Sequence, residues 1–134
     1  MKNRYLISTG GSGGHVIPAT IFYEHLSKEA DVIISTDKRG SKYLNKESYK
    51  FEIINTPKLN NILLLPFRLF KISFLTIKSF FLLRDKKITK LVSTGGYMSL
   101  PLIIASKLLG LKIYLLEPNL VLGRANRYFL NSCC

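Results

Sequence analysis

The sequence predicts an α/β domain with a Rossmann-like parallel sheet and helices on both faces. Short apolar runs rich in β-branched residues alternate with helical patterns along the chain, and glycine clusters directly follow two of these runs. A length of 134 residues allows one compact domain with a hydrophobic core. We therefore expect residues 1–134 to form a single domain.

The first half of the chain predicts three strands and two helices. Residues 5–8 form an apolar run that ends in a glycine cluster, after which Pro18 opens a helical pattern. Residues 31–35 form a second β-branched run, and a third strand is expected near residues 51–54. The polar residues 38–46 between them predict a short helix.

The second half repeats the order of strand, glycine turn and helix. A long apolar segment from Pro66 to about Leu83 precedes the strand candidate 91–93, which a second glycine turn and a helical pattern follow. Residues 111–116 predict another strand, and residues 123–130 predict the start of a helix. Ligands of parallel sheets bind at the carboxyl ends of the strands, so we expect both glycine turns at that edge.

The composition favours an anionic partner in a reducing compartment. Twenty Lys and Arg residues against eight Asp and Glu residues give a formal net charge of +12, which suits a phosphorylated substrate or an acidic membrane surface. Nucleic acid is not expected as a partner, because no RNP-like motif or zinc spacing occurs.

The two cysteines, Cys133 and Cys134, are adjacent, and no Asp-x-Asp pair occurs, so we expect no metal and no cofactor. The amino terminus lacks the apolar stretch of a signal peptide, which predicts a cytoplasmic location.

The first glycine cluster, Gly-Gly-Ser-Gly-Gly at residues 10–14, suits a phosphate or pyrophosphate. Glycines let the backbone approach a ligand closely, and a following helix directs free N–H groups toward an anion. His15 follows at the expected helix start, where the helix dipole favours a neutral ring that can accept a proton. The alternatives are a tight turn without a ligand and a histidine that caps the helix or packs on the sheet.

The apolar segment between residues 62 and 83 predicts a helix with a membrane-facing side. Three cations and Pro66 within the segment argue against a helix that spans the bilayer. A helix at the membrane interface and a core helix with a basic solvent face both fit the pattern. The residues expected to face the membrane are Leu64, Phe67, Arg68, Lys71, Phe74, Lys78 and Phe81.

Three motifs, taken together, resemble glycosyltransferase family 28 over almost the whole chain. They are Gly10-Gly11-Ser12-Gly13-Gly14-His15 with Pro18-Ala19, then Gly95-Gly96-Tyr97 with Ser99 and Pro101, then Glu117, Asn119, Gly123 and Asn126-Arg127. The resemblance implies the amino-terminal, acceptor-binding half of a two-domain GT-B enzyme, with the carboxy-terminal donor-binding domain absent from this chain. It also implies inverting transfer of N-acetylglucosamine from UDP-N-acetylglucosamine to an undecaprenyl-diphosphate-linked muramoyl pentapeptide, on the inner face of the plasma membrane.

The resemblance further implies roles for single residues. His15 becomes the candidate general base, with Glu117 as a second catalytic residue. Tyr97 lines the acceptor site together with Glu117, and the two glycine loops, including Gly95 and Gly96, hold the pyrophosphate of the acceptor. The residues expected to contact the donor sugar are Ser12, Gly13, Gly14 and Asn119.

The sequence departs from the family pattern at five positions. Ser12 replaces a Thr, which is a mild change, whereas neither Leu116 nor Pro118 supplies the side-chain donors that the family has beside Glu117. Leu100 and Leu122 replace a Gly and a Pro. Two alternatives remain open: the membrane-recruiting subunit of a split N-acetylglucosaminyltransferase, which also carries a glycine loop and histidine, and a non-catalytic module that binds polyanions or a membrane surface.

Overall fold

The computed structural model describes residues 2–11, 13–55, 62–95 and 99–116. These residues contain one five-stranded sheet with the strand order β3-β2-β1-β4-β5, in which every neighbouring pair is parallel. The strands are β1 (Arg4–Ser8), β2 (Asp31–Thr36), β3 (Phe51–Ile53), β4 (Lys90–Ser93) and β5 (Lys112–Leu115). The predicted Rossmann-like architecture is therefore confirmed.

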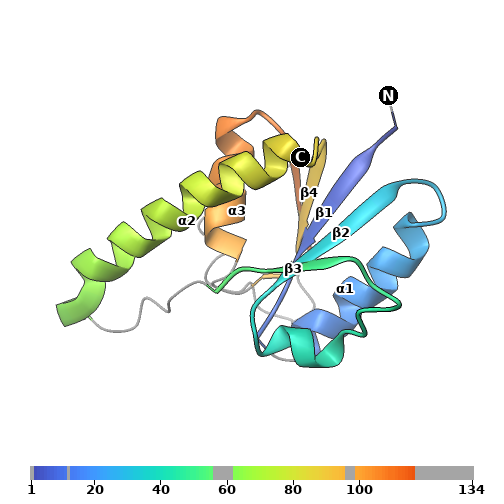
Figure 1. Ribbon diagram of the computed structural model, residues 1–134, viewed down its shortest axis with the longest axis horizontal. Coiled ribbons are helices and arrows are strands. Elements are labelled where there is room, and N and C mark those ends of the chain that lie inside the picture. Colours follow the sequence, from blue (N-terminus) through green and yellow to red (C-terminus); the bar gives the residue numbers. More distant parts are fainter. Residues whose placement is uncertain (1, 12, 56–61, 96–98, 117–134) are drawn as a thin grey trace.

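Helices cover both faces of the sheet (Figure 1). Helix α1 lies on one face, and α2 and α3 pack against each other on the other face. Between β2 and β3 the chain forms a short 3₁₀ helix, η1, and a second one, η2, leads into α2. The bounds are α1 (Gly13–Leu26), η1 (Gly40–Tyr43), η2 (Ile62–Leu64), α2 (Leu65–Asp85) and α3 (Ser99–Leu108).

The sheet separates two apolar clusters. Under α1, side chains of β1, β2 and β4 such as Ile7 and Ile34 surround Val16 of the helix. On the opposite face, Leu102 of α3 packs with Leu83 of α2 and with neighbouring strand residues. Burial of both faces explains why the strands read as continuous apolar runs instead of alternating patterns.

Two predicted helices differ from the structure. Helix α1 begins at Gly13, so Pro18 lies inside it instead of opening it. The missing N–H of Pro18 leaves the carbonyl of Gly14 without its helical donor, but Gly14 is exposed and solvent can supply one. The helix expected over residues 38–46 is only the four-residue η1. The helix expected over residues 123–130 lies outside the described residues.

Truncating one buried residue of α3 should measure how much its inner face contributes to stability. Leu102 has no exposed surface, so Leu102→Ala should lower the free energy of unfolding by about 2–5 kcal/mol. Leu108, at the end of the same helix, is 70% exposed, so Leu108→Ala should change stability by less than about 0.5 kcal/mol. Urea denaturation followed by circular dichroism measures both, and equal losses would contradict this packing.

Candidate functional site

The two glycine loops lie side by side at the carboxyl edge of the sheet, as predicted. Strands β1 and β4 are neighbours, with Ser8 paired to Ser93, so the loops that follow them start at the same level. The backbone N–H of Thr94 donates to the carbonyl of Ser8 at 2.9 Å, and the hydroxyl of Thr94 lies 2.7 Å from that of Thr9. Residues far apart in the sequence therefore meet in one buried junction.

A buried serine, Ser99, ties the second glycine turn to both strands. Its hydroxyl donates to the carbonyl of Gly95 at 3.0 Å and accepts hydrogen bonds from Ser8 and Ser93 at 3.2 and 3.0 Å. The N–H of Gly95 in turn donates to the Ser93 hydroxyl at 3.2 Å. Since Gly95 has a φ of 98°, which disfavours a residue with a side chain, this turn requires glycine.

His15 connects the two loops. Its ring nitrogen Nδ1 lies 2.9 Å from the backbone carbonyl of Thr94, although the residues are 79 positions apart. A carbonyl oxygen can only accept, so Nδ1 of the neutral ring carries the proton and Nε2 keeps its lone pair. The ring is only partly buried, so Nε2 is the nitrogen available to take a proton from a ligand.

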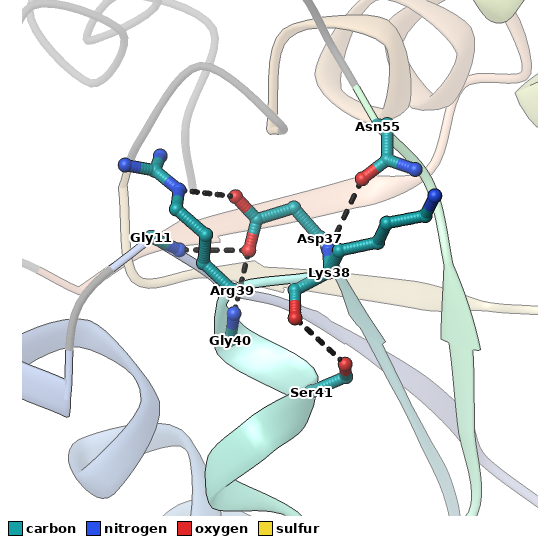
Figure 2. Close-up of polar contacts among 7 residues, drawn as sticks. All are labelled: Gly11, Asp37, Lys38, Arg39, Gly40, Ser41 and Asn55. Atoms are coloured by element: carbon teal, nitrogen blue, oxygen red, sulfur yellow. Dashed lines mark hydrogen bonds and ion pairs between the residues drawn. The ribbon is translucent and has the colours of Figure 1, made fainter.

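A carboxylate that the sequence analysis missed holds the first glycine loop. Asp37, directly after β2, accepts the N–H of Gly11 at 3.0 Å and the N–H of Gly40 at 2.7 Å (Figure 2). Gly11 has a φ of 81°, and a Cβ on Gly40 would lie 2.9 Å from Cα of Gly10, so the loop and η1 are in close backbone contact. The carboxylate thus fixes the shape of the loop.

The environment of Asp37 keeps its carboxylate charged. Burial alone would raise the pKa of Asp37, but hydrogen bonds from the Gly11 and Gly40 amides, together with Arg39, lower the pKa below its usual value. Nε of Arg39 donates to the second carboxylate oxygen at 3.3 Å. A negative charge therefore lies at the base of the first glycine loop, with one cation beside it.

The remaining predicted site residues divide into described and undescribed positions. Gly13 and Gly14 form the first turn of α1 beside His15, and Gly95 lies in the second turn. The other predicted members of the site lie outside the described residues: Ser12, Gly96, Tyr97, Glu117 and Asn119. Within the described part of the chain, no group of three or more His, Cys, Asp or Glu side chains is arranged to hold a metal ion.

Helix α2 carries an exposed apolar side opposite its buried side. Leu75 and Leu83 pack in the apolar cluster with α3 and the sheet, whereas a row of large apolar residues faces solvent. This row, here called the α2 stripe, consists of Leu63 of the preceding η2 and, from α2, Phe67, Phe70, Phe74, Ile77 and Phe81, each more than half exposed. Figure 1 shows the amino-terminal half of α2 extending beyond the sheet.

The residues predicted to face the membrane lie on or beside this stripe, except one. Leu64, Lys71 and Lys78 are exposed next to it, whereas Arg68 is half-buried. No helix among the described residues combines the length and apolarity needed to cross a bilayer. One side of α2 therefore packs in the core, and the opposite side is exposed and apolar, whereas contact of this side with a membrane stays a prediction.

Comparison with solved structures identifies the class of domain. The chain superposes on the crystal structure of Acinetobacter baumannii MurG with a TM-score of 0.81 and 20% sequence identity, over 99% of this chain and 40% of the other. The glycotransferase of kitacinnamycin matches with a TM-score of 0.66 and 10% identity, over 98% of this chain and 34% of the other. The fold is that of the amino-terminal domain of a GT-B glycosyltransferase.

Sequence comparison identifies the family within this class. The chain belongs to glycosyltransferase family 28, because the model of that family's N-terminal domain matches residues 5–133. The UDP-N-acetylglucosamine--N-acetylmuramyl-(pentapeptide) pyrophosphoryl-undecaprenol N-acetylglucosamine transferase of Pelagibacter ubique (strain HTCC1062) is 51% identical over 99% of this chain. The protein of the same name from Prochlorococcus marinus (strain AS9601) is 33% identical over 98% of it. The chain spans 38% and 37% of the lengths of these two curated relatives.

The lowered pKa of Asp37 predicts how acid affects stability. The folded-state pKa lies below that of the unfolded chain, so the stabilisation is complete above the unfolded-state pKa and is lost as pH falls through the folded-state pKa. Asp37→Asn should therefore cost about 1–3 kcal/mol at pH 7 and progressively less as the pH falls below about 4. Urea denaturation across this pH range measures the difference.

Asp31→Asn is the matched control, because Asp31 is partly exposed and pairs with the exposed side chains of Arg4 and Lys50. Such a pair contributes at most about 1 kcal/mol. If Asp37→Asn were no more costly than this control at pH 7, the carboxylate would not hold the loop.

Proposed function

We propose that this chain forms the acceptor-binding part of an enzyme that transfers N-acetylglucosamine from UDP-N-acetylglucosamine to an undecaprenyl-diphosphate-linked muramoyl pentapeptide. Family membership and the names of the curated relatives support the substrates. The observation that carries the proposal is the hydrogen bond from His15 to the Thr94 carbonyl. It holds, where the two glycine loops meet, an imidazole whose Nε2 has no hydrogen-bond partner among the described residues.

In this proposal His15 acts as the general base. Nε2 takes the proton of the attacking sugar hydroxyl while that oxygen bonds to the anomeric carbon of N-acetylglucosamine, and UDP leaves from the opposite face. A single displacement of this kind inverts the configuration. Proton transfer gives the ring a positive charge. The Thr94 carbonyl stabilises this charge by accepting the hydrogen bond from Nδ1.

The glycine loops provide the anion-binding part of the site. Helix α1 begins at Gly13, so its first free N–H groups and the positive end of its dipole face the carboxyl edge of the sheet. We assign to this edge the diphosphate of the acceptor and one side of the donor sugar. The proposed site also includes Ser12, Gly96, Tyr97, Glu117 and Asn119.

The donor side of the reaction requires a further part. In a GT-B enzyme two domains face each other across one cleft, and this chain covers less than two fifths of its curated relatives. We assign most contacts to UDP to a carboxy-terminal domain, on the same polypeptide or a separate one. The transfer reaction therefore needs both parts.

The α2 stripe supports a position on the inner face of the plasma membrane. Phenylalanine side chains that face solvent can enter the boundary between headgroups and acyl chains, and Lys71 and Lys78 beside them attract anionic lipid. Docking through this side leaves the buried side of α2 packed on α3. The enzyme would then bind its lipid-linked acceptor at the membrane surface.

Removing the proposed base should abolish transfer without unfolding the domain. With the chain supplemented by the donor-binding domain of a family relative, His15→Ala should lower the rate of labelled N-acetylglucosamine transfer by about 10²- to 10⁴-fold. His25→Ala is the control, since His25 is exposed at the far end of α1 and should leave the rate unchanged. Near-normal turnover of His15→Ala would exclude this residue as the base.

Polar substitutions in the α2 stripe should weaken membrane binding. Phe70 and Phe74 are 75% and 63% exposed, so the double variant Phe70→Ser, Phe74→Ser should bind vesicles of phosphatidylglycerol and phosphatidylethanolamine at least about tenfold more weakly. Ile21→Ser on α1, where Ile21 is 62% exposed, is the control. Vesicle sedimentation measures binding, and an equal loss in both variants would rule out docking through α2.

A further inference from the structure

Arg39 lies beside the first glycine loop because both bind the same carboxylate. The N–H of Gly11 donates to Oδ1 of Asp37, and Nε of Arg39 donates to Oδ2 at 3.3 Å (Figure 2). Asp37 itself is buried and directly follows β2, the neighbour of β1 in the sheet. The guanidinium group is thereby fixed at the carboxyl edge that carries His15.

The terminal nitrogens of Arg39 remain available to a ligand. Among the described residues, its side chain forms a hydrogen bond and an ion pair only with Asp37, and it does so through Nε. The side chain is 57% exposed, and Figure 2 shows both terminal nitrogens pointing away from the carboxylate. An arginine held at Nε presents its two terminal N–H₂ groups in a fixed orientation, which suits two oxygens of a phosphate.

The charge balance at the loop also calls for a cation. The N–H of Gly11 is occupied by Asp37, so this amide cannot bind a phosphate, and the charged carboxylate repels one. Arg39 offsets that charge and offers the donors that Gly11 does not. The side chain of Arg39 is exposed, whereas that of Asp37 is largely buried. A diphosphate at this edge would therefore contact the guanidinium group and not the carboxylate.

We propose that Arg39, oriented by Asp37, is a substrate-binding residue that donates hydrogen bonds to the diphosphate bound at the first glycine loop. This assignment rests on the proposed function and adds a residue to its site. Two substrates carry the required group: the lipid-linked acceptor, which has a prenyl diphosphate, and the donor, which has a nucleoside diphosphate. Asp37 acts as the positioning residue.

The test measures binding and not turnover, so that it can fail independently of the transfer reaction. Isothermal titration of the whole chain with geranyl diphosphate and, separately, with UDP gives the affinity for each kind of diphosphate. Arg39→Gln should weaken binding of at least one of them by about tenfold or more, because a hydrogen bond between charged groups is lost. Arg39→Lys keeps the positive charge but lacks the two terminal N–H₂ groups of arginine, so it should lose part of this affinity.

Arg84→Gln is the matched control for net charge. Arg84 is exposed in the last turn of α2, which leads to the amino end of β4, so this variant loses one arginine far from the loops. In the Asp37→Asn background, Arg39→Gln should cost less affinity for the same diphosphate than in the unsubstituted chain, because Nε of Arg39 is already released. A loss confined to geranyl diphosphate assigns Arg39 to the acceptor, and a loss confined to UDP assigns it to the donor.

Three results would overturn the proposal. One is unchanged affinity of Arg39→Gln for both ligands, and another is a loss no larger than that of Arg84→Gln. The third is the absence of binding by the unsubstituted chain. If Arg39→Gln lowered stability in urea without changing affinity, Arg39 would serve only to neutralise Asp37. A measured loss of binding would stand even if the His15 substitution left transfer intact.

Discussion

The pairing of β1 with β4 is the constraint on which the site depends. It places Ser8 beside Ser93, and the loops after these residues then share one edge of the sheet. The Ser99 hydroxyl network and the contact of His15 with Thr94 are possible only in this register. A shift by one residue would turn the serine side chains to the opposite face and break both.

Most of the fold could be predicted from the sequence because its signals are local. Buried parallel strands appear as short apolar runs, and the two glycine turns mark where strands end. Glycines mark positions where the backbone has a positive φ, such as Gly11 and Gly95, so these turns can be recognised from the sequence. His15 was also predictable, because it stands next to the first loop, but its partner Thr94 was not.

The contacts of Asp37 and Arg39 could not be predicted because they join separate parts of the chain. Gly11 and Asp37 are 26 residues apart, and nothing near Asp37 indicates that its carboxylate faces a glycine loop. The surrounding polar residues gave only a short helix as an expectation. The pattern of α2 predicted exposed phenylalanines at Phe67, Phe74 and Phe81, but it did not indicate that Phe70 and Ile77 would extend the same exposed row.

The strand order has a consequence for the nascent chain. One edge of β1 stays unpaired until β4 has been synthesised, roughly 80 residues later in the sequence. During that interval α2 is already present, with apolar residues on two sides and no α3 to cover the inner one. An open strand edge and an uncovered apolar helix both favour aggregation, so the nascent chain is most exposed to it before β4 and α3 have been synthesised.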